Sequence, residues 1–146
     1  MTSHAPASEP DQSGMQPVGD FWITLGYQGT DADGEHTIIE WDASEQYSFP
    51  DGKGGRIIHG GLVATLLDTA MGGACIETLE SGERFLTADL HTEFYRPARP
   101  GILRAVARVV RRTRAVAFCA AEVTDPDGKL VASARCTQIV RSEPDE

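Results

Sequence analysis

The segment from Gly60 to about Leu79 constrains the fold of this chain more than any other part of the sequence. It reads as one long helix whose apolar residues fall on nearly every face of the helical turn. These residues are Leu62, Val63, Ala64, Leu66, Leu67, Ala70, Met71, Ala74, Cys75 and Ile76. A helix that is apolar all round has no face suited to water, so other elements must cover it. A chain of 146 residues suits one domain, and that cover must come from the rest of the same domain.

The remaining sequence predicts mainly β-strands. Thr37–Trp41 carries the β-branched and aromatic residues typical of a strand. Residues 23–28 are compatible with a strand or a helix, and residues 43–56, with a proline and three glycines, indicate a loop. Four more strands are predicted over residues 86–95, 102–110, 116–124 and 130–140. Because short turns such as Asp125–Gly128 join them, we expect an α+β fold in which one antiparallel sheet wraps around one long central helix.

Two of these strands show a period of two residues. In the first, alternation places Leu86, Ala88, Leu90, Thr92 and Phe94 on one face and Thr87, Asp89, His91, Glu93 and Tyr95 on the other. In the last, the face shared by the apolar residues comprises Leu130, Ala132, Ala134, Cys136, Gln138 and Val140. One face of each strand is therefore expected to pack in the core.

The ends of the chain differ from this core in composition. Residues 1–19 are rich in alanine, serine and proline and have no apolar period, so we expect a disordered tail there, a domain over 20–141 and a short tail over 142–146. No apolar run has the length of a membrane-spanning helix, and no basic region followed by an apolar one marks a secretory signal. We therefore expect a cytoplasmic protein that does not bind membranes.

The charged and sulfur-containing residues exclude some functions. The net charge of −9 argues against nucleic-acid binding, which needs a basic face. Five of the eleven arginines lie between Arg104 and Arg114, where they either bind the phosphates of a ligand or simply face water. The three cysteines are widely spaced and are expected to be reduced core thiols, and no pattern of ligands indicates a metal site.

Asp68 lies in the middle of the apolar helix. An unpaired carboxylate among apolar side chains is energetically costly. Either a basic partner neutralises it, for instance an arginine from a strand, or it is a functional base or nucleophile whose reactivity the apolar site supplies.

The start of the helix carries the sequence His59-Gly60-Gly61. The first amides of a helix have no partner within the helix and carry partial positive charge. A glycine lets a ligand oxygen approach the backbone, so the Gly60 amide could bind a carbonyl oxygen and stabilise an oxyanion. Alternatively, the two glycines only allow a sharp entry into the helix.

Gly60 and Asp68 are separated by eight residues of helix, or about 12 Å. One carbonyl group cannot contact both within one chain. If both act on the same carbonyl, one of them must come from a second subunit whose helix runs antiparallel, which predicts a two-fold dimer with shared sites.

The run from His59 to Gly72 resembles the helix start of hotdog-fold thioesterases, and in particular of the branch named for the phenylacetate pathway (PaaI-type). That branch has His-Gly-Gly, an apolar stretch, and an Asp nine residues after the His, as here at Asp68. Thr87–Leu90 with Tyr95–Ala98, and Val123–Ala132, resemble later strands of the family. The resemblance covers roughly residues 20–141 and implies a hotdog fold.

The resemblance also implies an activity and an assembly. We expect hydrolysis of a small or medium acyl-CoA, with aromatic acyl groups included, by a homodimer or a dimer of dimers. Coenzyme A is then part of the substrate, and no separate cofactor is expected. Asp68 would act as base or nucleophile, and the Gly60 amide would polarise the carbonyl. Thr87 would orient Asp68 or the attacking water, unless it is simply a β-branched strand residue. His59 would be catalytic or would fix the loop.

The expected substrate contacts are Gly61 and Lys53, with arginines for the phosphates. The candidate arginines are Arg96, Arg111, Arg112 and Arg114. Many members of the branch carry an Asn or Gln on the loop before the His, whereas residues 51–56 contain no amide side chain. Either Lys53 or a backbone group substitutes for it, or the activity differs. The alternatives are therefore a module that binds acyl-CoA without hydrolysing it, and a hotdog dehydratase or hydratase.

Overall fold

A computed structural model describes residues 20–30 and 35–143, so the predicted tail over residues 1–19 and residues 144–146 of the predicted C-terminal tail lie outside the described residues. The elements in chain order are α1 (Asp20–Leu25), β1 (Gln28–Thr30), β2 (Thr37–Ala43), the 3₁₀ turn η1 (Glu45–Tyr47), β3 (Ser48–Pro50), β4 (Arg56–Ile58), α2 (Gly60–Ile76), β5 (Glu83–Phe94), β6 (Gly101–Arg112), β7 (Val116–Thr124) and β8 (Leu130–Ser142).

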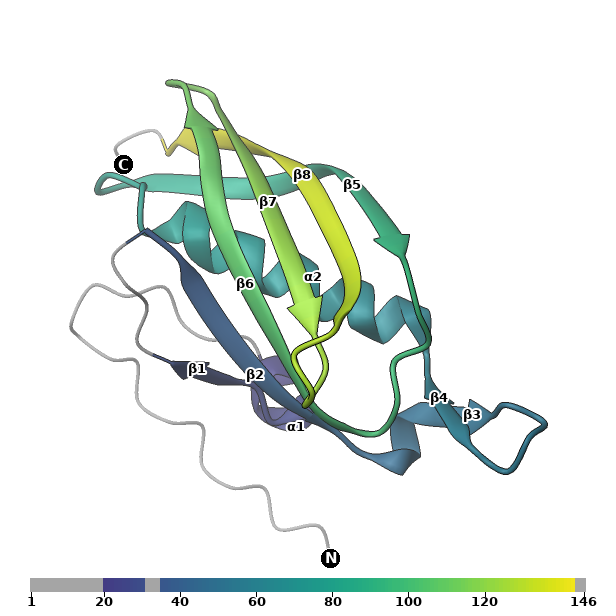
Figure 1. Ribbon diagram of the computed structural model, residues 1–146. Coiled ribbons are helices and arrows are strands. Elements are labelled where there is room, and N and C mark those ends of the chain that lie inside the picture. The colour runs from purple at the N-terminus through teal and green to yellow at the C-terminus, as the bar shows by residue number, and fades with distance from the viewer. Residues whose placement is uncertain (1–19, 31–34, 144–146) are drawn as a thin grey trace, which may run out of the picture.

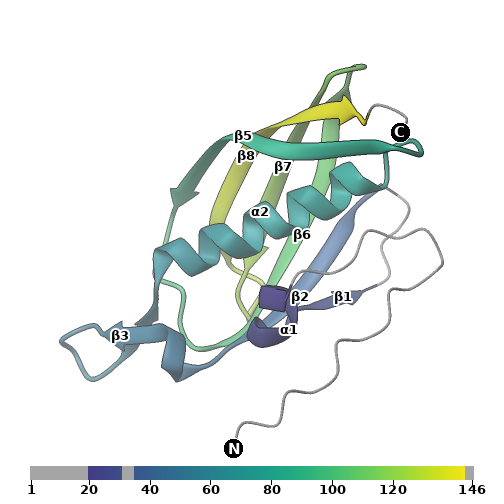
Figure 2. The ribbon, with the colours of Figure 1, turned by 180° about the vertical axis from the view of Figure 1, so that it is seen from behind.

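The main sheet has six antiparallel strands in the order β1-β2-β6-β7-β8-β5, and β3 and β4 form a separate hairpin. The long helix α2 lies along one face of the main sheet, which curves around it (Figure 1, Figure 2). This confirms the predicted α+β fold with one long central helix.

Small side chains bring the sheet close to α2. The inward residues of β6 and β7 are mostly alanines, such as Ala105, Ala107 and Ala121. The helix fills the space above them with Leu66, Leu67, Met71 and other buried residues. Burying one such side chain stabilises the fold by about 1.5–3 kcal/mol. The all-round apolar pattern therefore reflects a helix whose cover comes from its own domain.

The strand β5 does not keep the alternation predicted from the sequence. Its register with β8 shifts between Thr87 and Asp89, so that Ala88 is an extra, bulged residue. Phe85 and Thr87 therefore lie opposite inward residues of β8 in the first half of β5, and Leu90 does so in the second half. The prediction that Leu86 and Leu90 share a face is wrong, and Leu86 is 77% exposed. The physical reason is that one inserted residue turns every side chain beyond it to the opposite face of the strand.

The segment predicted to be a loop over residues 43–56 contains regular structure. It forms η1 and the hairpin of β3 and β4. Asp51 organises the turn, because its Oδ1 accepts the N–H groups of Lys53 and Gly55, and its Oδ2 accepts a bond of 2.7 Å from Arg99 Nη1. The Lys53 amide, the Arg99 guanidinium and the Gly55 amide hold the pKa of Asp51 below its ordinary value of 3.8.

Other boundaries differ by a few residues. Residues 23–28, left open between helix and strand, contain the end of α1 and the start of β1. The helix α2 ends at Ile76 rather than near Leu79. β8 continues to Ser142, and the Glu143 amide donates to Gly82 O, so ordered structure extends past residue 141.

Cys75, Cys119 and Cys136 are buried and not in disulfides, as predicted for core thiols. Within the described ranges, no group of three His, Cys, Asp or Glu side chains is arranged to hold a metal ion. None of the helices described has the length and apolar character needed to cross a bilayer.

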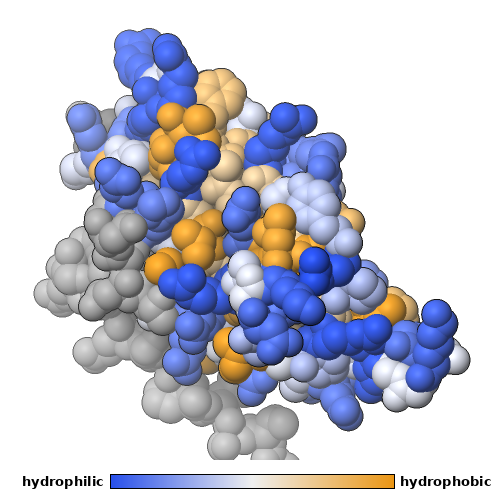
Figure 3. All heavy atoms as spheres, viewed as in Figure 1, coloured by the Kyte–Doolittle hydropathy of each residue, from blue (hydrophilic) through white to orange (hydrophobic). Residues whose placement is uncertain are grey.

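The outer face of the sheet carries apolar patches separated by hydrophilic residues (Figure 3). Exposed apolar side chains there include Ile102 and Phe118, and the neighbouring Arg104, Arg108 and Arg111 are exposed as well. Most of the arginine-rich segment therefore faces outward, away from α2.

Candidate active site

His59 caps the N-terminus of α2. Its Nδ1 accepts the Gly61 amide at 3.0 Å, and its carbonyl accepts the Leu62 amide at 2.9 Å. Its own amide donates to Tyr47 O at 3.0 Å, which ties the helix start to η1. Such capping satisfies donors that the helix leaves free. These contacts give His59 a role in fixing the entry to the helix.

The Gly60 amide is the first donor of α2. Of the residues described, none accepts a hydrogen bond from it, whereas Gly61 and Leu62 donate to His59. A Cβ at position 60 would lie 3.4 Å from the Phe94 ring, so a β5 side chain already borders this site. A free, partly positive helix-terminal N–H beside an apolar ring suits a carbonyl oxygen that gains negative charge.

Asp68 lies two turns further along α2 and is partly buried. The Thr87 hydroxyl donates to Asp68 Oδ1 at 2.9 Å across 19 residues of sequence. The bulge at Ala88 makes this contact possible, because it turns Thr87 to the helix side of β5. Among the residues with described positions, no basic side chain forms an ion pair with Asp68. The alternative of neutralisation by an arginine is therefore not what this structure contains.

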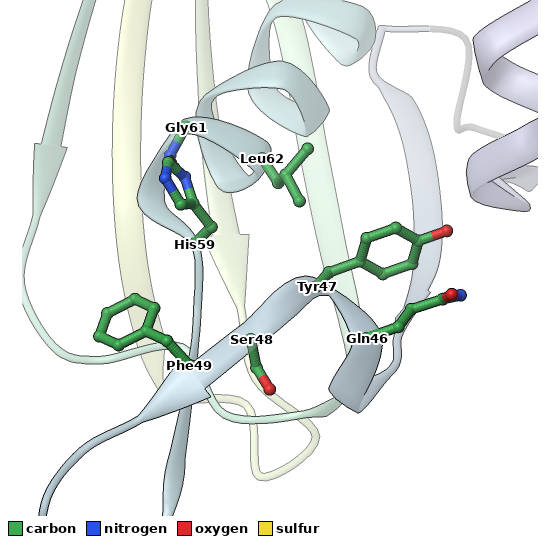
Figure 4. A pocket seen from close by; sticks show the side chains of 7 residues that line it. All are labelled: Gln46, Tyr47, Ser48, Phe49, His59, Gly61 and Leu62. Carbon is green, nitrogen blue, oxygen red and sulfur yellow. Dashed lines mark hydrogen bonds between the residues drawn. The ribbon is translucent and has the colours of Figure 1, made fainter.

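A pocket of about 460 Å³ opens beside the start of α2. Its lining consists of Gln46, Tyr47, Ser48, Phe49, His59, Gly61 and Leu62 (Figure 4). η1 and β3 form one side and the first turn of α2 forms the other, so Gly61 lies in the wall of the pocket next to the Gly60 amide.

The contribution of η1 to this pocket was not predicted from the sequence. Gln46 is the amide side chain in the lining, although it precedes the loop over residues 51–56 where an amide was sought. Its side chain extends away from His59 (Figure 4). The sequence of this segment predicts a loop, and the hydrogen bond from the His59 amide to Tyr47 O, which joins η1 to the start of α2, depends on the folded structure.

The predicted basic contacts are dispersed. Arg96 and Arg114 are exposed in connections, and Lys53 is exposed in the turn of the β3–β4 hairpin. Arg112 instead points into the fold, where Nη2 bonds to Glu83 Oε1 and Nε to Thr78 Oγ1, both at 3.0 Å. A phosphate would have to compete with Glu83 for this guanidinium.

The two chemical parts of the site lie on one helix but not at one place. The Gly60 amide and the Asp68 carboxylate are separated by about 12 Å of helix. One chain therefore provides an oxyanion donor at the helix start and a carboxylate further along, each beside a different part of β5.

Comparisons with known proteins agree with this arrangement. The family model described as "Thioesterase superfamily" matches residues 55–132. The medium/long-chain acyl-CoA thioesterase YigI of Salmonella typhimurium is 32% identical over 97 residues, which are 58% of this chain and 63% of that protein. YigI of Escherichia coli K12 is 31% identical over 97 residues, with the same coverage of both chains. This chain thus spans less than two thirds of these curated relatives.

Solved structures extend the similarity over most of the chain. A thioesterase-type, phenylacetic acid degradation-related protein from Ralstonia eutropha JMP134 is 33% identical, with a TM-score of 0.76 over 86% of this chain and 93% of that one. AziG from S. sahachiroi has a TM-score of 0.77 at 22% identity over 87% of this chain and 100% of that one, which shows a common fold. Because the family model covers more than half of the sequence and includes Gly60, Asp68 and Thr87, this chain belongs to the thioesterase superfamily and has its hotdog fold.

Proposed function

We propose that this protein hydrolyses the thioester bond of acyl-CoA. The observation that supports this function most is the pairing of a hydroxyl-held carboxylate, Asp68 with Thr87, with a free helix-terminal amide at Gly60. Thioester hydrolysis needs a base or nucleophile on one side of the carbonyl and a donor for the oxyanion on the other. The names of the YigI relatives support the same activity.

In the proposed reaction, the thioester carbonyl accepts the Gly60 N–H. Asp68 takes a proton from water while the water oxygen forms a bond to the carbonyl carbon, or Asp68 itself attacks that carbon. Collapse of the oxyanion breaks the C–S bond, and the thiolate of coenzyme A leaves and takes up a proton. If Asp68 was the nucleophile, the acyl group is then held as an anhydride, and a water molecule hydrolyses it to the free acid and the Asp68 carboxylate. No separate cofactor enters either route.

The proposed active unit is a homodimer. β5 is an edge strand of twelve residues, and its apolar residues are poorly covered: Leu90 is 41% and Phe94 is 52% exposed. Unpaired backbone groups on such an edge pair readily with another strand. Antiparallel pairing of two β5 strands about a two-fold axis would place two α2 helices side by side in opposite directions. Asp68 of one chain would then face Gly60 of the partner subunit.

We infer the kind of acyl group from the side chains that line the pocket. Tyr47, Phe49 and Leu62 offer apolar surface for a small or medium acyl group, and the adjoining Gly61 borders the thioester. Phosphates of coenzyme A would then meet exposed cations on the surface, for which Lys53, Arg96, Arg111 and Arg114 are available. A second dimer could cover the outer face of the sheet.

The test uses two inactivating variants. Asp68→Asn removes the base, and Gly60→Pro removes the amide hydrogen at the first helical position, where proline is tolerated. His59 already has an extended ψ of 124°, as a residue before proline requires. Release of free thiol from a panel of acyl-CoA esters should occur with the wild type and should be lost in each variant.

Co-expression of the two variants then tests the shared site. A mixed dimer keeps one complete site, formed by Asp68 of the Gly60→Pro chain and Gly60 of the Asp68→Asn chain. Random mixing should restore about a quarter of the wild-type activity. No recovery in mixed dimers confirmed by mass would contradict the shared site, and full activity of Asp68→Asn would contradict the mechanism.

A binding module that does not hydrolyse its ligand is the second candidate. The observation in its favour is the absence of an amide side chain from residues 51–56. Binding of acyl-CoA without any thiol release by the wild type would support it. A hotdog dehydratase or hydratase would likewise release no thiol but would change the acyl chain.

A further inference from the structure

Gln138 on β8 is a polar residue buried in an otherwise apolar core. Of all polar and charged residues in the described part of the chain, it alone is buried, with 0% of its surface exposed. Its Nε2 donates only to Cys136 Sγ, at 3.3 Å, and its Oε1 has no hydrogen-bond donor. An amide oxygen that is buried without a donor destabilises the folded state. A methionine or leucine would fill the same space without this disadvantage.

Gln138 lies directly opposite Thr87 in the β5–β8 ladder. Opposed residues of an antiparallel pair point to the same face and have Cβ atoms about 4.5–5.5 Å apart. The Gln138 amide therefore extends from the strand position beside Thr87, whose hydroxyl donates to Asp68. On its other side, Gln138 pairs with Ala117 of β7, which has no polar side chain.

Of the two residues paired with Gln138 in the ladders, Thr87 and Ala117, only Thr87 has a side-chain donor that could serve Oε1. A hydroxyl has one hydrogen and can donate it to one acceptor at a time. In the structure this hydrogen goes to Asp68 Oδ1, which leaves Oε1 empty. The hydroxyls of Tyr27 and Thr92 are also buried without a partner, but neither residue faces Gln138 across a ladder.

We propose that Gln138 is a positioning residue that accepts the Thr87 hydroxyl hydrogen when Asp68 carries a proton. The inference rests on the proposed function, in which Asp68 accepts a proton from water. The ionised carboxylate needs a donor, which Thr87 supplies. The protonated carboxyl needs an acceptor. Thr87 Oγ1 can accept from it only if the Thr87 hydroxyl donates its own hydrogen to an acceptor other than Asp68.

The hydrogens balance through the cycle. The attacking water gives one proton to Asp68, whose new O–H donates to Thr87 Oγ1. The Thr87 hydrogen rotates from Asp68 to Gln138 Oε1. When Asp68 releases its proton to the departing thiolate, Thr87 donates to the carboxylate again. Gln138 thus lets one hydroxyl stabilise both protonation states of the carboxyl group, and its empty acceptor in the resting enzyme is part of the mechanism.

The experiment combines activity with stability. Gln138→Met keeps the length of the side chain and removes both polar atoms. We expect kcat to fall about tenfold, the scale of one lost hydrogen bond in the reaction, with KM for acyl-CoA unchanged. The melting temperature should stay the same or rise, because the unsatisfied acceptor is gone.

Val140→Ala is the matched control, since Val140 is buried on the same face of β8 two residues further on. It should lower the melting temperature and leave kcat intact. A purely structural Gln138 would behave in the opposite way, with a lower melting temperature in Gln138→Met and an unchanged kcat, and that result would overturn the proposal.

A double-mutant cycle tests the route through Thr87. In a Thr87→Val background, Gln138→Met should reduce kcat little further, because the hydroxyl that links Gln138 to Asp68 is absent. An equal loss in both backgrounds would overturn the proposal while leaving hydrolysis itself established. If the wild type hydrolyses no acyl-CoA, the proposed function fails and this inference fails with it.

Discussion

The two edges of the main sheet are built differently. β1 has three residues, and the adjoining α1 is tied to the sheet because Trp41 Nε1 donates to Leu25 O at 2.9 Å. β5 has twelve residues and is exposed along most of its length. Short edge strands resist pairing with other chains, whereas long apolar ones invite it, so we call the β1 edge the closed edge and the β5 edge the open edge.

The candidate active site lies beside the open edge. Thr87 and Phe94 of β5 border Asp68 and Gly60, respectively. The closed edge instead adjoins aromatic packing, in which Tyr27 meets Trp22 and Trp41 edge to face with ring centroids 5.6 and 6.0 Å apart. This difference is what the proposed dimer requires, because the second subunit would cover β5 and complete the proposed site.

The largest effect is expected when the open edge is blocked. Leu90→Lys places a charge on the apolar face of β5, so two β5 strands should no longer pair. Light scattering should show single chains, and thiol release should fall by about a hundredfold or more because the shared site is lost. Gln28→Lys on the closed edge is the control and should change neither mass nor activity. A fully active monomer would refute the difference between the edges.

A smaller effect is expected at the anchored end of β5. Arg112 bonds to Glu83 at this end of β5 and to Thr78 in the connection from α2, and the charged side chains of Arg112 and Glu83 are only 21% and 13% exposed. Arg112→Gln should lower the free energy of unfolding by about 1–3 kcal/mol, because Glu83 loses its charged partner. Urea denaturation measures this change. A raised KM for acyl-CoA with unchanged stability would instead place Arg112 in phosphate binding.

A substitution near the closed edge should lower stability without loss of activity. Trp41→Phe keeps an aromatic ring and removes the bond to Leu25 O. The expected loss of stability is about 1 kcal/mol from the hydrogen bond, plus the cost of the cavity that the smaller ring leaves, with kcat unchanged. Thermal unfolding and thiol release on the same preparation would check both. A fall in kcat would show that the aromatic side of the molecule takes part in the reaction.

The smallest effect concerns the β3–β4 hairpin, which lies off both edges. The pKa of Asp51 is lower in the fold than its ordinary 3.8, so its stabilising contribution is complete above pH 3.8 and is lost as the pH falls through the lower, folded value. Melting temperatures of the wild type should therefore decline below pH 3.8. Asp51→Asn should melt at a lower temperature at neutral pH and show a weaker decline. Parallel curves for the two proteins would contradict this assignment.

Much of the fold could be predicted from the sequence because its signals are local. The apolar pattern of α2 and the strands after it needed no knowledge of distant contacts, and Val116–Thr124 was predicted with the bounds observed. The pattern of β8 also placed Gln138 on the apolar face, where it is buried. The sequence His59-Gly60-Gly61 at the helix start and the carboxylate within the apolar helix pointed to Gly60 and Asp68 as candidate site residues.

The remaining features depend on contacts between segments. The bulge at Ala88 is set by pairing with β8, and an alternating sequence does not reveal one extra residue. The hairpin around Asp51 depends on Arg99, which lies 48 residues away. The proposed role of Gln138 depends on its register opposite Thr87, which no spacing along the chain encodes.

The extra residue in β5 also limits how this site could be transplanted. Before the bulge, the odd-numbered positions 85 and 87 face α2, and after it the even-numbered positions 90, 92 and 94 do so. Phe85 borders Gly72, and Phe94 borders Gly60. A regular strand can present only one parity to the helix. A protein designer who copied the same side chains onto an ideal strand would therefore reproduce one end of the catalytic helix and lose contact with the other.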